Sequence, residues 1–261
     1  KCLVKLSSES NIFGLMTFSL FRRARKDRPP PRTEPGQRIY AIGDIHGRFD
    51  LHQALLEKIV ADAATCPNRD PVLIYLGDFI DRGPSSDRMI ETLAAPPPDG
   101  FQAHYLMGNH EDMMVQFIDG INIADVWLNN GGEHTLECYG CPGIDEPERA
   151  REALLANIPA HHLAFLRALK SHHMAGDYLF VHAGLRPGVP IEGQLERDMM
   201  WIRGPFLKSK KDFGKIVVHG HSIRREPEIC ANRIGIDTGA WRTGVLTCLV
   251  LDGEEKKFLS T

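Results

Sequence analysis

From Arg38 onward, the chain alternates between short apolar runs and longer segments with helical periodicity. The apolar runs are rich in β-branched and aromatic residues, which is typical of buried strands: IYAI, VLIYL, AHYLM, YLFV and KIVV. Helical periodicity is seen in FDLHQALLEKIVADA and REALLANIPAHHLAFLRALK. The last segment, IGIDTGAWRTGVLTCLVLDGEEKKFLS, predicts a β-meander with turns at residues 242–244 and 252–253. The pattern indicates a chain of the α/β (α+β) class.

Each apolar run is followed by a short segment of glycine and polar residues. These segments are GDIHG, GDFIDRG, GNHED, HAGLRPG and HGHS. Polar loops at the carboxyl ends of buried strands are where α/β enzymes build their active sites. Residues 111–175 contain no such segment but several helix-like stretches, which predict a helical insertion beside the site. We therefore expect residues 38–261 to form a single domain.

The first 37 residues have a different composition. A short apolar run, NIFGLMTFSL, precedes the basic and proline-rich run FRRARKDRPPPRTEPGQ. This order is the reverse of a secretory signal, in which the basic region comes first. We predict a flexible tail for residues 1–37, with a peripheral membrane contact through its phenylalanine and arginine side chains as the alternative.

Composition narrows the class of protein. A net charge of -3 on 261 residues argues against binding of nucleic acid through general electrostatic attraction. No run of 18 apolar residues occurs, so we expect no transmembrane segment. Six scattered cysteines favour reduced thiols and a cytoplasmic protein, and Cys138 and Cys141 are interpreted as thiols in a loop rather than as a zinc or redox pair. We expect a monomer.

The polar residues at the strand ends are of types that bind metal ions and phosphate. They are Asp44, His46, Asp78, Asp81, Arg82, Asn109, His110, His182, Arg203, His219 and His221. Carboxylate, imidazole and amide ligands without cysteine suit manganese, iron or zinc. Two ions fit this ligand count better than one, because ions ~3.5–4 Å apart can share a hydroxide nucleophile and hold a phosphate.

Phosphate hydrolysis also needs positive charge beside the metal ions, and arginine matches phosphate geometry. Arg82 follows directly from the turn that contains Asp78. Arg203, in MMWIRGPF, is from the residues alone equally well explained as a surface residue beside Trp201. His219 is interpreted as a strand-end residue that packs in the core. Asp237 either braces the site or forms a turn before Thr238 and Gly239.

The order, glycine framing and spacing of these motifs resemble the PPP family of metallophosphoesterases. The motifs are GDIHG at 43–47, GDFIDRG at 77–83, GNHE at 108–111, HAG at 182–184 and GH at 220–221. The similarity covers residues 38 to about 252, and the bacterial serine/threonine protein phosphatase type, similar to lambda phosphatase, fits best. It implies a four-layer metallophosphoesterase fold, with a central β-sandwich of mixed sheets flanked by helices.

The resemblance also implies roles for single residues. Two divalent ions, with Mn²⁺ expected and iron or zinc as alternatives, would be held by Asp44, His46, Asp78, Asn109, His182 and His221. Asp78 would bridge the ions. The substrate phosphate would be bound by Arg82, Arg203, Asn109 and His110. His110 would protonate the leaving oxygen, and Asp81 would orient His110.

The expected activity is hydrolysis of a phosphomonoester by a metal-bridging hydroxide. The main expectation is a phosphoprotein phosphatase for phosphoserine and phosphothreonine, with phosphotyrosine as a further substrate. The alternative is a symmetrical diadenosine tetraphosphate hydrolase, and a third hypothesis is an inactive phosphoprotein-binding module. The tyrosine-containing loop of eukaryotic relatives is not recognisable after His221. Arg224 and Arg225 follow instead, and they either extend recognition toward acidic substrates or lie in an exposed turn.

Overall fold

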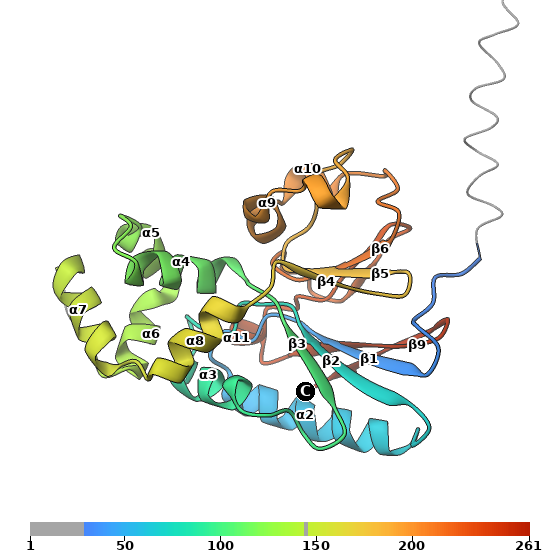
Figure 1. Ribbon diagram of the computed structural model, residues 1–261, viewed down its shortest axis with the longest axis horizontal. Coiled ribbons are helices and arrows are strands. Elements are labelled where there is room, and N and C mark those ends of the chain that lie inside the picture. Colours follow the sequence, from blue (N-terminus) through green and yellow to red (C-terminus); the bar gives the residue numbers. More distant parts are fainter. Residues whose placement is uncertain (1–28, 144–145) are drawn as a thin grey trace, which may run out of the picture. The chain divides into compact units, whose positions relative to one another are not determined.

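The computed structural model describes residues 29–143 and 146–261. Its strands form two five-stranded sheets within these residues (Figure 1). The first sheet has the order β10-β9-β1-β2-β3. Its strands are β1 (Gln37–Ile42), β2 (Asp70–Tyr75), β3 (Gln102–Tyr105), β9 (Thr247–Asp252) and β10 (Glu255–Ser260). The second has the order β4-β5-β6-β8-β7. Its strands are β4 (His172–Ala175), β5 (Tyr178–Val181), β6 (Ile216–His219), β7 (Glu228–Ile229) and β8 (Arg233–Gly235).

The strand register brings the motif loops to common sheet edges. In the first sheet β1, β2 and β3 are parallel, and their last residues, Ile42, Tyr75 and Tyr105, lie opposite one another. In the second sheet β5 and β6 are parallel, with Val181 opposite His219. Because parallel strands end at the same edge, the polar segments that follow them emerge side by side.

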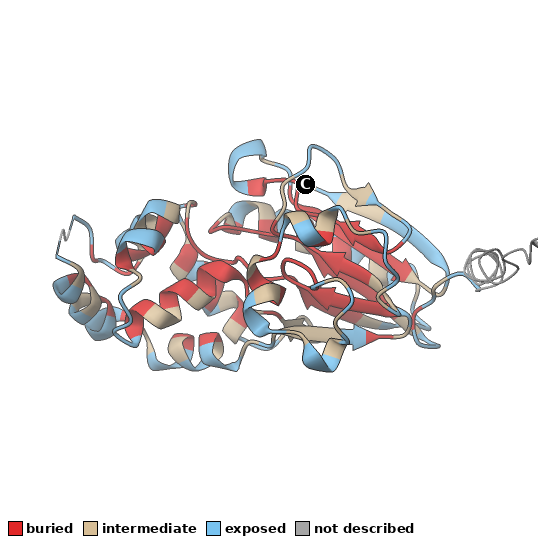
Figure 2. Ribbon diagram, turned by 90° about the horizontal axis from the view of Figure 1, so that it is seen from above, coloured by how far each residue is buried: buried red, intermediate tan, exposed pale blue. Residues whose placement is uncertain are grey.

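Strands β5 and β9 are buried along almost their whole length because both faces of the sheets are covered there. Along β1, Ile39 and Ala41 join the core between the sheets, which includes Phe180 of β5. Tyr40 and Ile42 face the other way and pack with the helices. Figure 2 shows the resulting band of buried residues through both sheets.

Helices cover the outer faces of the sheets. The core on the outer side of the first sheet includes side chains from α2 (Phe49–Ala64) and α3 (Ser86–Ala94). On the outer side of the second sheet lie α9 (Glu196–Trp201) and α10 (Gly204–Leu207), whose Met199 and Phe206 pack against Leu179 of β5. The layers are therefore helix, sheet, sheet and helix, which confirms the predicted fold class.

The segment between β3 and β4 is helical. Its elements are α4 (Asn109–Ile118), α5 (Ala124–Trp127), a π-helical turn (Leu128–Gly132), α6 (Glu133–Cys138), α7 (Pro147–Asn157) and α8 (Ala160–Ala168). Gly131, with φ of 106°, interrupts the run between α5 and α6. A proline at residue 159 separates α7 from α8, because proline cannot continue a helix.

The C-terminal segment differs from the predicted β-meander. β8 pairs in the second sheet, whereas β9 and β10 form a hairpin in the first. The one-turn helix α11 (Ala240–Thr243) lies between β8 and β9 in the chain. It is bounded by the left-handed residues Gly239 and Gly244. The chain changes sheets here because Ile234 and Leu249 both contribute to the core between the sheets. The predicted turn at residues 242–244 is therefore the end of a helix.

The chain that precedes β1 is described from residue 29 onward. Residues 1–28 of the predicted tail lie outside the described residues. From residue 31 onward the chain packs on the fold: the amides of Arg32 and Thr33 donate to Asp177 and to the Gly253 carbonyl. The five described cysteines are free thiols. A short 3₁₀ turn spans Ile191–Gly193, and no helix among residues 29–143 and 146–261 is long and apolar enough to cross a membrane.

Candidate metal centre

The predicted site residues have an unusual backbone conformation. Among the described residues, five non-glycine residues have positive φ between 50° and 70°: His46, Asp78, Asp81, Arg82 and His221. All five belong to the predicted site. Such strain concentrates at functional sites, where surrounding contacts hold it. The turns are also tightly packed, since a Cβ atom on Gly77 would lie 2.5 Å from the backbone nitrogen of Gly108.

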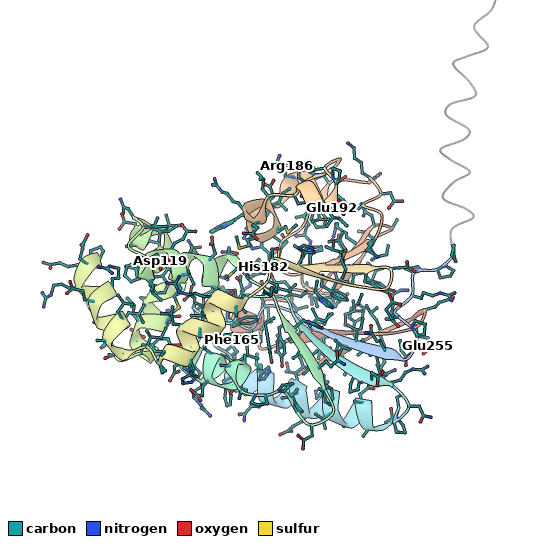
Figure 3. The ribbon with its side chains drawn as sticks, in the orientation of Figure 1. Asp119, Phe165, His182, Arg186, Glu192 and Glu255 are labelled. Atoms are coloured by element: carbon teal, nitrogen blue, oxygen red, sulfur yellow. The ribbon has the colours of Figure 1, made fainter. Side chains whose placement is uncertain are left out.

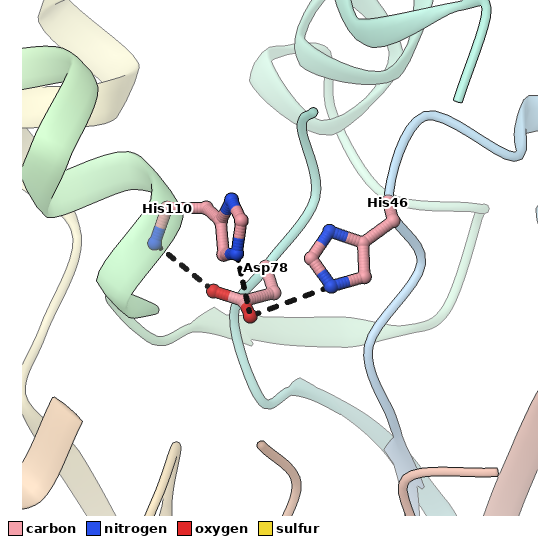
Figure 4. Close-up of side chains that lie close together, drawn as sticks. All are labelled: His46, Asp78 and His110. Carbon is pink, nitrogen blue, oxygen red and sulfur yellow. Dashed lines mark hydrogen bonds and ion pairs between the residues drawn. The ribbon is translucent and has the colours of Figure 1, made fainter. Parts of the chain in front are cut away.

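The first cluster of candidate ligands comprises His46, Asp78 and His110, whose ligand atoms lie within 4.8 Å of one another. Oδ2 of Asp78 is 3.5 Å from Nε2 of His46 and 3.9 Å from Nε2 of His110 (Figure 4). The backbone N–H of His110 donates to the other oxygen, Oδ1, at 3.1 Å. One side of the Asp78 carboxylate therefore faces His46.

The second cluster comprises Asp78, His182 and His221, again within 4.8 Å. Nε2 of His182 lies 3.4 Å from Oδ1 of Asp78, 3.1 Å from Oδ1 of Asn109 and 3.2 Å from Nδ1 of His221. His182 follows β5 and lies between the helical segment and the second sheet (Figure 3). The two oxygens of Asp78 thus face two different histidine clusters, and this carboxylate lies between them.

Hydrogen bonds and burial favour the neutral form of the candidate ligand histidines. Nδ1 of His46 is 2.9 Å from the carbonyl oxygen of Ile80, and Nδ1 of His182 is 2.9 Å from that of Leu76. A carbonyl can only accept, so each Nδ1 carries the proton and each Nε2 keeps its lone pair. Burial lowers the pKa values of both histidines and of His221.

Asp44 lines the same cleft, although its carboxylate lies outside the two clusters. It is buried and accepts the backbone N–H of His221 at 3.0 Å. Burial, followed by the nearby carboxylates of Asp237 and Asp78, raises the pKa of Asp44 well above its ordinary value. Three buried carboxylates among neutral imidazoles need added positive charge, and this donor set therefore fits divalent cations.

His110 has a different environment from Asn109. Its Nδ1 lies 2.6 Å from Oδ2 of Asp81. Asp81 is fully buried, and its carboxylate also accepts from Nε1 of Trp127 at 3.0 Å and from Oγ1 of Thr135 at 2.5 Å. Burial opposes a charged His110, but Asp78 and Asp81 outweigh it and raise the pKa of His110. This arrangement suits a proton donor.

Trp127 and Thr135 are functional neighbours that the sequence motifs did not indicate. Both belong to the helical segment that was expected only to lie beside the site. Glu111, the last residue of GNHE, was also left without a role. Its carboxylate accepts the backbone N–H groups of Asp78, Phe79 and Gly108 at 2.9, 2.7 and 3.0 Å. Glu111 therefore ties the Asp78 turn to the start of α4.

Both predicted arginines reach the site. Nη1 of Arg82 lies 2.7 Å from Nε2 of His46, and Nε of Arg203 donates to Nε2 of His221 at 2.8 Å. Both arginines line a cleft of about 770 Å³ together with Asp44, Asp78, Asn109, His110 and His221. The structure therefore places Arg203 in the cleft beside His221, a position that the residues alone left open.

Other residues of the cleft refine the sequence interpretation. Arg224, His134 and Trp241 line it. Asp237 lines it too, while its Oδ1 accepts the N–H of Gly239 at 2.8 Å, so it serves the turn and the cleft together. Burial raises the pKa of Asp237 to about 6. His219 is buried against Phe206, with ring centroids 5.0 Å apart, as expected for a packing residue.

Solved structures of other proteins have a similar fold. The solved structure of a candidate diadenosine tetraphosphatase is similar over 87% of this chain and 95% of its own, with a TM-score of 0.59 and 20% identity. A cold-active protein tyrosine phosphatase from a psychrophilic Shewanella is similar over 90% and 84%, with a TM-score of 0.57 and 17% identity. At these identities the two likenesses concern the fold alone.

The sequence comparison gives closer relatives. The chain is 30% identical over 226 residues to the asymmetrical bis(5′-nucleosyl)-tetraphosphatase PrpE of Bacillus cereus, covering 80% of this chain and 88% of that protein. These relatives carry a tetraphosphatase name rather than that of the lambda-like protein phosphatase expected from the motifs. The calcineurin-like phosphoesterase profile matches residues 37–237. The chain therefore belongs to the calcineurin-like phosphoesterase family.

Proposed function

We propose that this metallophosphoesterase hydrolyses dinucleoside tetraphosphates, with asymmetrical cleavage into a nucleoside triphosphate and a nucleoside monophosphate. The observation that carries the proposal is the 30% identity, over 88% of its length, to a Bacillus cereus protein named for this reaction. The proposal favours the alternative drawn from the motifs over phosphoprotein hydrolysis. It differs from that alternative in the bond cleaved, because the relatives are named asymmetrical.

Two divalent cations would be held by Asp44, His46, Asp78, Asn109, His182 and His221. Manganese is the ion that we would add first in an assay. When bound, the two cations would neutralise phosphate charge and lower the pKa of water at neutral pH. The donor set supports this assignment because burial lowers the pKa values of His46, His182 and His221, which favours their neutral form, and because the carboxylates are buried.

The protein's own residues would bind and orient the polyphosphate. Arg82 and Arg203 approach the two histidine clusters from different segments, so their guanidinium groups can bind oxygens on opposite sides of the reacting phosphorus. Arg224 adds a third guanidinium to the same cleft. A tetraphosphate carries more negative charge than a phosphomonoester, and a third arginine favours it.

His110 would donate a proton to the leaving oxygen, with Asp81 holding its ring in place. Water adds to phosphorus, the bridging P–O bond of the anhydride breaks, and the leaving nucleotide takes up the proton. A nucleotide leaving group is less basic than an alcohol, so the proton contributes less here than in phosphomonoester hydrolysis.

A direct comparison of substrates tests the proposal. Diadenosine tetraphosphate and peptides containing phosphoserine, phosphothreonine or phosphotyrosine would be assayed with Mn²⁺ under identical conditions. We expect the dinucleotide to have the highest kcat/KM and to give ATP and AMP in equal amounts. Two molecules of ADP would contradict the asymmetrical assignment, and faster phosphopeptide hydrolysis would overturn the proposed substrate.

A further inference from the structure

The cleft is lined by an exposed indole that the reaction chemistry does not use. Trp241 has 37% of its surface exposed, although a large aromatic side chain is normally well buried. Its ring centroid lies 5.3 Å from Cζ of Arg82, the arginine whose guanidinium reaches His46. An aromatic surface therefore lies directly beside a phosphate-binding group.

The backbone holds Trp241 in place. Its helix α11 is a single turn bounded by the left-handed residues Gly239 and Gly244. Oγ1 of Thr243 lies 3.0 Å from the carbonyl oxygens of both Thr238 and Gly239. Ala240, the preceding residue, is buried, and its carbonyl accepts from Arg48 at 3.3 Å. The indole is thus presented from a fixed turn rather than from a free loop, which reduces the ordering cost of binding.

Trp127 differs from Trp241 in its exposure. Trp127 is fully buried, and its Nε1 donates to Asp81. Trp241 instead lines the cleft with an exposed ring. Aromatic rings of this kind stack on nucleobases, and a base stacked on one contributes about 1–3 kcal/mol. The guanidinium of Arg82 at this ring adds a cation–π contact.

We infer that Trp241 is a nucleobase-stacking subsite, on which a purine of the substrate lies while Arg82 binds the adjoining phosphate. The inference rests on the proposed function, because it supplies the nucleoside part of a nucleotide-containing substrate. The 770 Å³ of the cleft exceed what one phosphoryl group fills and fall within the range of sites that hold whole ligands. A substrate without a nucleobase gains nothing from Trp241.

Inhibition constants of ADP and inorganic pyrophosphate test the subsite without requiring turnover of a dinucleotide. Both carry a diphosphate, and only ADP carries a base. Each would be measured as a competitive inhibitor of para-nitrophenyl phosphate hydrolysis by the Mn²⁺-loaded full chain. In Trp241→Ala we expect the constant for ADP to rise at least about fivefold and that for pyrophosphate to change less than about twofold. Trp241→Phe, which keeps a stacking surface, should stay close to the original protein.

Val245→Ala is the matched control, because Val245 is 39% exposed and follows α11, but does not line the cleft. It should leave both constants unchanged. Equal changes for ADP and pyrophosphate in Trp241→Ala would overturn the subsite and show that the indole only positions Arg82. No change in either constant would overturn it as well. A failure of the proposed function appears separately, as absence of diadenosine tetraphosphate hydrolysis by the unmodified protein.

Discussion

Nδ1 of His110 lies 2.6 Å from Oδ2 of Asp81, and this contact separates the roles of two adjacent residues. The neighbouring Asn109 directs its Oδ1 toward His182, at 3.1 Å from Nε2. Both residues begin α4, where Gly108 precedes them as the N-terminal cap. Successive helical side chains leave the axis about 100° apart, so the two side chains reach different partners. Asn109 thus lies with the candidate metal ligands, whereas His110 pairs with Asp81.

His110→Asn should therefore keep both metal ions and lower kcat. Loss of a general acid reduces rates by about 10²–10⁴-fold, and the loss should be greatest for substrates with basic leaving groups. Metal content would be measured by mass spectrometry, and kcat would be compared between phenyl phosphate and para-nitrophenyl phosphate. A variant that binds one ion fewer would show that His110 is a ligand.

Trp127→Phe should lower kcat about 5- to 50-fold without changing metal content. The substitution removes the N–H that donates to Asp81 at 3.0 Å but keeps an aromatic ring in the core. Hydrogen bonds to a charged group contribute about 1.5–3 kcal/mol, so the orientation of His110 should suffer. Phe117→Leu is the control, because Phe117 packs on Trp127 with centroids 4.9 Å apart. An equal loss in that control would assign the effect to packing.

The motif residues could be predicted because their positions depend on local rules. Apolar runs ended at glycines, and parallel strands place their carboxyl ends at one edge, so His46 and Asp78 were expected together. The contact of Trp127 with Asp81 spans 46 residues of sequence and that of Thr135 spans 54. No periodicity encodes such a distance. It depends on how the helical segment packs against the loop that follows β2.

Trp241 could not be placed for a different reason. The segment around it has alternating apolar residues and turn-forming glycines, which predicted a β-meander. The local pattern is similar whether two strands pair with each other or join different sheets. Ile234 and Leu249 are buried in the same core between the sheets, and this packing places β8 and β9 in different sheets. Such tertiary packing cannot be derived from the local pattern.

Asp78→Asn should lose bound metal and activity together, with kcat falling at least about 10³-fold. Its Oδ2 lies 3.5 Å from His46 and its Oδ1 3.4 Å from His182, so the substitution removes charge from both clusters. Metal content and activity would be titrated with Mn²⁺. Retention of two ions and most of the activity would contradict a bridging role.

Asp62→Asn should destabilise the fold at neutral pH by about 1–3 kcal/mol. The Asp62 carboxylate accepts from Arg38 at 2.8 Å and from Tyr40 at 2.9 Å, and it also pairs with Lys257. Burial alone would raise the pKa of Asp62, but these donors outweigh it and lower the pKa below its ordinary value.

The sign of the pH dependence follows from that direction. A carboxyl with a depressed pKa in the folded state contributes stability above the unfolded value of about 3.9, and this contribution is lost as pH falls through the folded pKa. Urea unfolding of both proteins would be compared at pH 7 and near pH 3. The difference between the original protein and Asp62→Asn should shrink at the lower pH, because the carboxyl of Asp62 is then largely protonated in the unfolded state and its charge contributes less to stability. An equal difference at both pH values would mean that the shape of the side chain, and not its charge, stabilises the contact between β1 and α2.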